Sequence, residues 1–168
     1  MISDRIKLRP LSEQDLEALL TGQNNINNVN IASLAISEPL KKAINIKLVM
    51  MKSAANEDKL WLTYWLIIKN DNSEAIGTIG FKGIDKEEKS AEIGYGISGE
   101  FEGKGYATEA LSLMVAWAWN TKKIEKVTAI DVLASNIGSQ KVLEKNGFYR
   151  TKVNIDTIDY EINLKNSR

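Results

Sequence analysis

The stretch EGKGYATEA, residues Glu102–Ala110, points most directly to a fold, because a glycine-rich turn runs straight into an amphipathic helix. Glycines let the backbone pass close to a ligand. The helix that follows directs its unpaired N–H groups and the positive end of its dipole back at the turn. Such a turn suits a phosphate or pyrophosphate, but the same glycines would also serve a tight strand-to-helix connection. The stretch alone leaves both interpretations open.

Two common phosphate-binding motifs do not fit these residues. A P-loop requires Ser or Thr after its lysine, whereas Lys104 is followed by Gly105. Residues 94–99 spell the dinucleotide fingerprint G-x-G-x-x-G, but they lie within and just after an expected strand, and no helix begins there. Both motifs are therefore rejected.

The composition narrows the possible classes of protein. A chain of 168 residues with 43% apolar content suits one domain, which we expect to span residues 1–168. Lys+Arg and Asp+Glu both number 22, so no basic excess points to nucleic acid as a partner. No apolar segment is long enough for a signal peptide or a membrane span, so we expect a cytoplasmic protein with no membrane partner.

The chain has no Cys and no His. These absences exclude disulfides, a thiolate nucleophile, a Ser-His-Asp triad and the usual zinc ligands, and we expect no metal. Proton transfers in an enzyme of this composition would depend on Asp, Glu, Tyr, Lys, Ser, backbone groups or water.

The pattern of apolar residues and turn residues predicts the element order βααβββαβαββ. Strands are expected at Ile6–Arg9, Trp61–Lys69, Ala75–Lys82, Ser90–Ser98, Lys126–Leu133, Phe148–Val153 and Ile158–Leu164. Helices are expected from the cap Ser12-x-x-Asp15 to Leu20, at Pro39–Ala55, directly after the glycine turn, and at Ile137–Asn146. The helix after the glycine turn has an apolar stripe that is expected to face the core, made of Leu111, Met114, Val115 and Ala118. Residues 23–30 are expected to form a surface loop. This order predicts an α/β fold of the α+β type with a mixed, mostly antiparallel sheet.

The glycine turn lies between the strands Ser90–Ser98 and Lys126–Leu133. Strands joined by a crossover helix usually run parallel, so these two should be neighbours. We expect them to splay apart where the turn holds its ligand.

These residues resemble the GNAT superfamily of N-acetyltransferases, and within it the Rim-type branch that acetylates ribosomal-protein N-termini. The family's acetyl-CoA turn, [QR]-x-x-G-x-[GA], is matched by Glu102-x-x-Gly105-x-Ala107 except at its first position. The strand Ala91–Tyr95, the opening Leu8–Ser12 and the later set Asn136, Ser139, Glu144, Lys145, Gly147 and Phe148 also resemble the family, in the family's order. The resemblance implies a GNAT-like sheet and acetyl-CoA as co-substrate.

The resemblance also implies where acetyl-CoA lies. Backbone amides of Gly103, Lys104, Gly105, Tyr106, Ala107 and Thr108 would hold the pyrophosphate, Ile97 and Ser98 would pair with the pantetheine arm like an added strand, and Asn136 and Ser139 would face that arm from the other side. Asn136 could also serve as a helix N-cap. The carboxylate of Glu102 would repel the pyrophosphate unless it points away or pairs with Lys104.

Three residues are the candidates for catalysis. Glu92, at the start of its strand, and Asp131, where relatives carry Glu, are alternative bases for the amine. In many relatives a Tyr acts as the general acid at the position where this chain has Leu143. The resemblance to the Rim-type branch suggests Ser139 instead as the group that assists the departing sulfur. A backbone N–H near Ile97 would stabilise the oxyanion. Without Cys, direct transfer in a ternary complex is expected.

The leading hypothesis is an acyltransferase that moves an acetyl group from acetyl-CoA to a primary amine, most directly a protein N-terminal amine. The alternatives are acetylation of a small amine such as a polyamine or aminoglycoside, and a non-catalytic acyl-CoA-binding module. A cleft ringed with carboxylates would favour the polyamine. We expect a monomer or homodimer.

Overall fold

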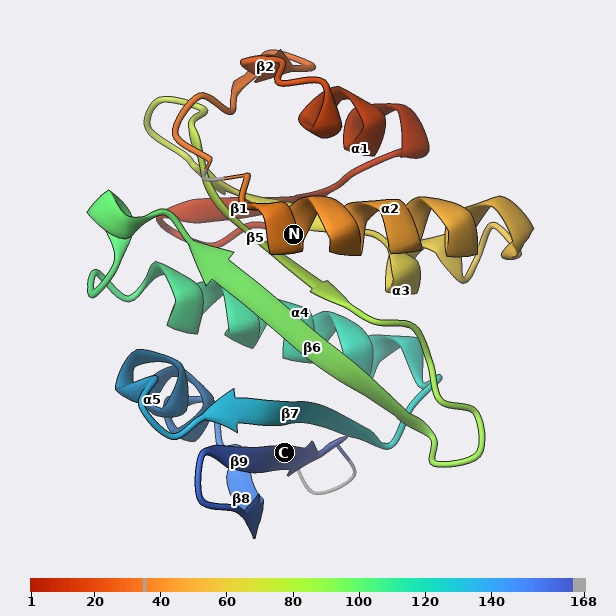
Figure 1. Cartoon of the computed structure of the whole chain (residues 1–168), viewed down its shortest axis with the longest axis vertical. Coiled ribbons are helices and arrows are strands. Elements are labelled where there is room, and N and C mark those ends of the chain that lie inside the picture. Colours follow the sequence, from red (N-terminus) through yellow and green to blue (C-terminus); the bar gives the residue numbers. More distant parts are fainter. Residues whose placement is uncertain (35, 165–168) are drawn as a thin grey trace.

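The computed structural model describes residues 1–34 and 36–164, in which helices and strands follow the predicted order with four short additions, β2, β3, α3 and η1 (Figure 1). The strands are β1 (Ile6–Pro10), β2 (Asn25–Ile26), β3 (Val29–Asn30), β4 (Trp65–Lys69), β5 (Ala75–Phe81), β6 (Ser90–Ile97), β7 (Lys126–Leu133), β8 (Tyr149–Val153) and β9 (Thr157–Asn163). The helices are α1 (Glu13–Leu20), α2 (Glu38–Ser53), α3 (Lys59–Leu62), η1 (Gly99–Phe101), α4 (Tyr106–Thr121) and α5 (Ile137–Lys145).

Among the described residues, the main sheet runs β1-β4-β5-β6-β7-β9-β8. Its one parallel pair, β6 with β7, is in register only over Ser90–Glu92 and Lys126–Thr128, whereas β6 continues to Ile97 and β7 to Leu133. The two strands therefore separate beyond Glu92, as Figure 1 shows, and the predicted splay is confirmed.

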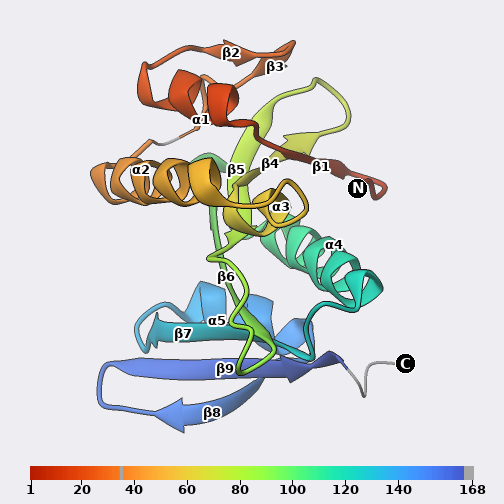
Figure 2. The same cartoon turned by 90° about the vertical axis from the view of Figure 1, so that its right-hand side faces the viewer.

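Helices cover both faces of the sheet, with α1 and α2 on one side and α4 on the other (Figure 2). Alternate residues of β4 face the two sides: Trp65 and Ile67 join the core beneath α4, whereas Leu66 and Ile68 join the core beneath α2. A strand buried on both faces reads as a continuous apolar run, which is how Trp65–Ile68 reads. The stripe of Leu111, Met114 and Ala118 on α4 is buried as predicted, while Val115 is only partly buried.

The start predicted for the strand Trp61–Lys69, which corresponds to β4, is wrong. Trp61 and Leu62 lie in the short helix α3, and β4 begins only at Trp65. Aromatic and β-branched residues favour strand locally, but the helical turn places the ring of Trp61 against Phe81, with ring centroids 4.9 Å apart, and this burial outweighs local propensity.

Residues 23–30 hold the small hairpin β2–β3, where only a loop was expected. Asn27 and Asn28 form its turn with φ of 49° and 64°, a left-handed conformation that Asn tolerates. The hairpin buries Ile26 and Val29 beneath α1 and α2. Residue 35, within the loop that leads to α2, lies outside the described residues.

Candidate active site

The glycine turn leads directly into a helix, as predicted. Gly103 and Gly105 have φ of 71° and 83°, which glycine adopts without strain, and α4 begins at Tyr106. Gly105 is the N-cap residue and offers no side chain to the helix. The N–H groups of Tyr106, Ala107 and Thr108 therefore lie at an open helix N-terminus, which attracts anions.

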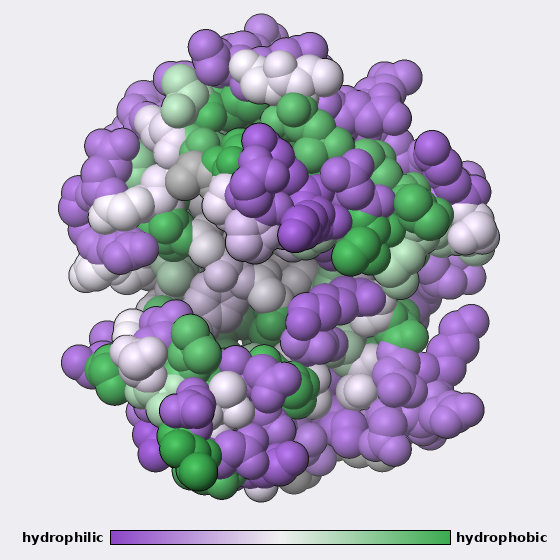
Figure 3. All heavy atoms as spheres, viewed as in Figure 1, coloured by the Kyte–Doolittle hydropathy of each residue, from purple (hydrophilic) through white to green (hydrophobic). Residues whose placement is uncertain are grey.

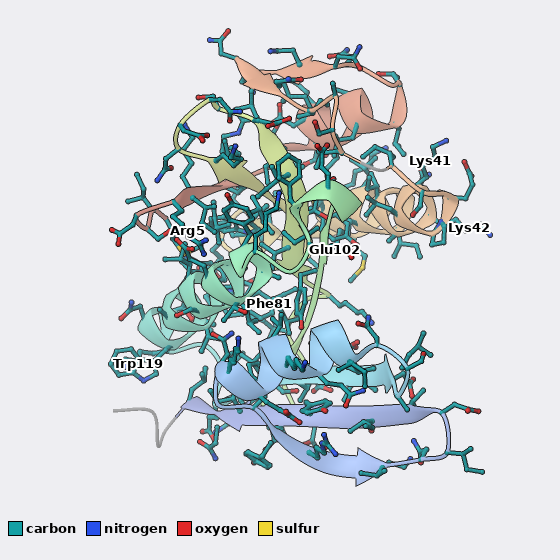
Figure 4. The ribbon with its side chains drawn as sticks, turned by 90° about the vertical axis from the view of Figure 1, so that its left-hand side faces the viewer. Arg5, Lys41, Lys42, Phe81, Glu102 and Trp119 are labelled. Atoms are coloured by element: carbon teal, nitrogen blue, oxygen red, sulfur yellow. The ribbon has the colours of Figure 1, made fainter. Side chains whose placement is uncertain are left out.

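Arg5, just before β1, braces this turn (Figure 4). Its Nη1 donates to the Lys104 carbonyl at 3.0 Å, its Nε donates to Glu109 Oε2 at 2.8 Å, and its guanidinium lies 4.8 Å from the centre of the Tyr106 ring. Burial alone would raise the pKa of the Glu109 carboxyl, but hydrogen bonds from Ser3 and Arg5 outweigh it and lower this pKa. Arg5 thus holds the glycine turn in place together with the first helical turn of α4.

Residue Arg5 was not among the predicted site residues. It lies 104 residues from Glu109, and no local pattern joins such distant positions. Lys104 itself extends over the Phe101 ring, with Nζ 5.5 Å from its centre, and within the described part of the chain no ion pair joins it to Glu102.

The end of β6 presents unpaired backbone to the splay. The Lys82 N–H donates to the Glu92 carbonyl, and the Ser98 N–H donates to the Ile76 carbonyl, so residues 92 and 98 hydrogen-bond toward β5. Hydrogen-bonding direction alternates along a strand, so the N–H and C=O groups of Tyr95 and Ile97 point away from β5, toward the side from which β7 has separated. The Ser98 hydroxyl donates to the Ser33 carbonyl at 2.6 Å.

The N-terminus of α5 borders the same splay. Asn136 is its N-cap residue and accepts the Ser139 N–H at 3.0 Å, so its capping role is present and contact with a cofactor stays a prediction. The Tyr95 hydroxyl lies 3.0 Å from Ser139 Oγ and donates to the Ser139 carbonyl at 3.2 Å. Burial raises the pKa of Tyr95 to about 12 although the hydrogen bond with Ser139 acts in the opposite direction. Tyr95 is a second site residue that was missed, since its contact spans 44 residues.

The candidate base Glu92 is half-buried and forms an ion pair with Lys82. It lines a charged cavity of about 720 Å³ on the α2 side of the sheet. The ionisable residues that line this cavity are Asp58, Asp85, Glu88, Glu92, Glu161, Lys82, Lys86 and Lys126. Most of these carboxylates have a lysine partner, since Lys126 lies 3.0 Å from Glu88 and 3.8 Å from Glu161.

The other candidate base, Asp131, lies apart from Glu92. It is exposed at a β-bulge between Ala129 and Val132 and has φ of 56°. Its N–H donates to Asp159 Oδ1 at 2.9 Å, and its Oδ1 accepts the Thr157 hydroxyl at 3.4 Å. Asp131 is not one of the described residues that line the charged cavity. The structure therefore brings Glu92, but not Asp131, to the charged cavity.

A second, smaller cavity of about 260 Å³ lies between the start of α2 and strands β5 and β6. Figure 3 shows pale surface of near-neutral hydropathy hollowed below α2. The cavity is lined by Leu34, Ile36, Ser37, Leu40, Tyr64, Gly77, Thr78, Gly94, Tyr95, Gly96, Ile97 and Ser98.

Two further features of the described residues bear on possible ligands. In the ranges 1–34 and 36–164, no group of three or more His, Cys, Asp or Glu side chains is placed to hold a metal ion. Across the same ranges, no helix combines the length and the apolar character needed to cross a membrane.

Comparison with known proteins places this geometry among acetyltransferases. The family model described as acetyltransferase (GNAT) domain matches residues 5–149. The chain is 30% identical over 151 residues to the uncharacterized N-acetyltransferase YoaA of Bacillus subtilis, covering 90% of this chain and 83% of YoaA. It is 39% identical over 84 residues to the uncharacterized N-acetyltransferase YjdG of the same organism, a match that spans about half of each chain.

Solved structures share the fold. RimL, a ribosomal L7/L12 alpha-N-protein acetyltransferase in complex with coenzyme A, superposes with a TM-score of 0.69 at 18% identity, covering 97% of this chain and 96% of RimL. A dodecameric spermidine N-acetyltransferase from Vibrio cholerae superposes with a TM-score of 0.68 at 16% identity, with the same coverage of 97% and 96%. At such identities the likeness establishes the fold alone.

Proposed function

The chain belongs to the GNAT acetyltransferase family, and from this premise we propose that it transfers the acetyl group of acetyl-CoA to a protein N-terminal amine. The observation that carries the proposal is the open N-terminus of α4 beside the splay between β6 and β7. The turn would hold the pyrophosphate, and the free edge of β6 at Tyr95 and Ile97 would pair with the pantetheine arm. A cytoplasmic location and a monomeric or homodimeric state are part of this proposal.

The chain's own groups supply what amine acetylation requires. A neutral amine must attack the thioester carbon, because an ammonium has no free electron pair, and a terminal amine with a reference pKa near 8 needs less help than a lysine near 10.4. We assign Glu92 as the base that takes this proton, since it lines a cavity, and keep Asp131 as the alternative. The outward-facing N–H of Ile97 would stabilise the oxyanion.

The departing sulfur needs a hydrogen-bond donor as the carbon–sulfur bond breaks. Ser139, at the mouth of the splay, is the proposed donor, and Tyr95 would hold it by donating its own proton to Ser139 Oγ, 3.0 Å away, in place of the Ser139 carbonyl. The serine proton is then left for the sulfur. With a pKa of about 12, Tyr95 stays protonated at working pH and serves as a fixed partner rather than as a proton source.

A small polycationic amine is the second candidate acceptor, because several carboxylates line the charged cavity. Lysines, however, neutralise Glu92, Glu88 and Glu161. A polyamine would have to displace both Lys82 and Lys126 from these carboxylates, whereas a terminal amine would have to displace only Lys82 from Glu92. This pairing favours the protein N-terminus.

Acetyl-CoA consumption with a peptide bearing a free N-terminus, the same peptide with a blocked N-terminus, and spermidine tests the proposal. We expect turnover with the free peptide, with intersecting initial-rate lines because both substrates must be bound before transfer. Faster turnover with spermidine would support the polyamine instead. Binding of coenzyme A without turnover on any amine would support a non-catalytic module.

Comparison of the variants Glu92→Gln and Asp131→Asn tests which carboxylate is the base. We expect Glu92→Gln to lower kcat/KM by about 100-fold, as for removal of a general base, and Asp131→Asn to lower it less than threefold. Both effects are measured as initial rates across pH. Full activity of both single variants and of the double variant would assign the proton to bulk water.

Loss of the brace at Arg5 should weaken cofactor binding. We expect Arg5→Gln to raise the Kd for coenzyme A about tenfold, since a charge-assisted hydrogen bond contributes about 1.5 kcal/mol to holding the turn. Calorimetry measures the Kd, and kcat at saturating acetyl-CoA should change little. The matched control is Arg150→Gln, which removes a comparable exposed pair with Glu144 at 2.8 Å. Equal Kd values for both variants would contradict the bracing role.

A further inference from the structure

Two glycines of β6 have no structural reason to be glycine. Gly94 and Gly96 lie in regular strand paired with Gly80 and Thr78, and a Cβ atom added to either would meet no atom within 4 Å. Their φ angles lie outside the left-handed region. Glycine weakens a strand and often marks a close approach by a ligand or another backbone. The space in front of these two residues is therefore available to a ligand.

The neighbouring strand shows the contrast. A Cβ atom at Gly77 would lie 2.3 Å from the Gly96 carbonyl oxygen, and one at Gly80 would lie 2.5 Å from the Thr63 carbonyl oxygen. Close packing explains these glycines of β5 but not those of β6.

The glycines line one of two cavities of different character that lie along β6. Side chains at i and i+2 share one face of a strand, so Glu92, Gly94 and Gly96 point to the same side. Glu92 lines the charged cavity, whereas Gly94 and Gly96 line the smaller one. A ligand whose amine reaches Glu92 would therefore lay its next group across the glycines.

The smaller cavity would accept only an uncharged group. The described residues that line it include no Asp, Glu, Lys or Arg, and its apolar lining residues include Leu34, Leu40 and Ile97. Moving a charge there without a partner is strongly unfavourable. Its volume of about 260 Å³ lies just below the range of whole-ligand pockets, so it suits one side chain rather than a whole substrate.

We propose that the cavity floored by Gly94 and Gly96 binds the first side chain of the acceptor and selects a peptide whose first residue is uncharged and apolar. This inference rests on the proposed function and adds the specificity of the same site. It also predicts that a polyamine is a poor acceptor, because the amine beyond the reacting one would enter a cavity without a carboxylate.

The test uses peptides that differ only at their first residue, with Met, Ser or Lys there. We expect kcat/KM to be highest for Met and at least tenfold lower for Lys. Gly96→Val, which fills the cavity, should lower kcat/KM for the Met peptide at least tenfold, chiefly through KM. The same variant should keep the Kd for coenzyme A within twofold and the melting temperature unchanged or raised, because valine favours strands and its Cβ atom would have open space.

Gly99→Val is the matched control, since Gly99 also has open space for a Cβ atom but lies outside the cavity lining. It should keep the preference for Met. Transfer that is indifferent to the first residue, or a Gly96→Val enzyme with unchanged kinetics, would overturn the inference. A wild-type preference for butyryl-CoA that Gly96→Val abolishes would also overturn it, because the acyl chain would then occupy the cavity. Absence of transfer to every peptide would instead contradict the proposed function.

Discussion

Gly105→Asp should abolish the binding of coenzyme A, raising its Kd by at least about 100-fold, or roughly 2.7 kcal/mol. Gly105 is the N-cap residue of α4, and the first N–H groups of the helix lie open beside it. An aspartate there would offer its own carboxylate to these N–H groups and would repel the phosphates. An ideal Cβ at Gly105 lies 3.4 Å from Arg5 Nη2, so the new carboxylate would also compete for the brace.

Two controls separate charge from backbone strain. Gly105→Asn introduces a side chain of the same size as aspartate, which tolerates the same left-handed conformation but carries no charge. It should weaken the binding of coenzyme A less than Gly105→Asp does. Gly22→Asp introduces the same residue at a φ of 74° in open space, away from the site, and should leave the Kd unchanged. Calorimetry with folded variants measures all three. An unchanged Kd for Gly105→Asp would remove the glycine turn from the cofactor site.

Lys47→Met should stabilise the fold at pH 7 by about 1 to 3 kcal/mol, a rise in melting temperature of roughly 2 to 12 °C. Lys47 is only 6% exposed, and its Nζ donates to the Phe81 carbonyl at 2.5 Å and lies 4.5 Å from the centre of the Tyr64 ring. Burial, and to a lesser extent the charge of Lys82, lower the pKa of Lys47 from 10.5 to about 8. Methionine removes this buried charge, although it leaves the Phe81 carbonyl without its donor.

The pH dependence of this gain has a defined sign. Between about pH 8 and 10.5 the unfolded chain binds the Lys47 proton and the folded chain does not, so the wild-type free energy of unfolding should rise through this window relative to that of Lys47→Met. The advantage of the variant is therefore greatest below pH 8 and shrinks above it. Chemical denaturation across pH measures the difference. Lys42→Met, on the exposed side of the same helix (Figure 4), should show no such dependence. A constant difference for Lys47→Met would contradict the burial of a charged amine.

Elements whose signals are local were predicted well. The Ser12 side chain accepts the Asp15 N–H at 3.1 Å and the Asp15 carboxylate accepts the Ser12 N–H at 3.0 Å, the capping box that was expected before α1. The glycine turn and the helix after it likewise involve residues within one or two turns of each other. Such signals survive folding because the partners are neighbours in the chain.

Elements that depend on distant partners were predicted poorly. Trp61 entered α3 rather than a strand because its ring packs against Trp117, with centroids 4.6 Å apart, on a helix much later in the chain. The burial of Lys47 also depends on distant partners, since it lies on α2, which packs over the sheet that contains Phe81. Local propensity carries no information on such contacts.

The sequence by itself determined the order of the longer helices and strands, the glycine turn ahead of α4, and a chemistry without Cys or His, because each depends on residue type or on near neighbours. The tertiary structure alone decided that Arg5 braces the turn, that Tyr95 meets Ser139, and that Glu92 rather than Asp131 lines the charged cavity. It also decided which glycines face open space. The physical reason is that side chains far apart in sequence meet only when the sheet assembles, and the parting of β6 from β7 exists only in that assembly.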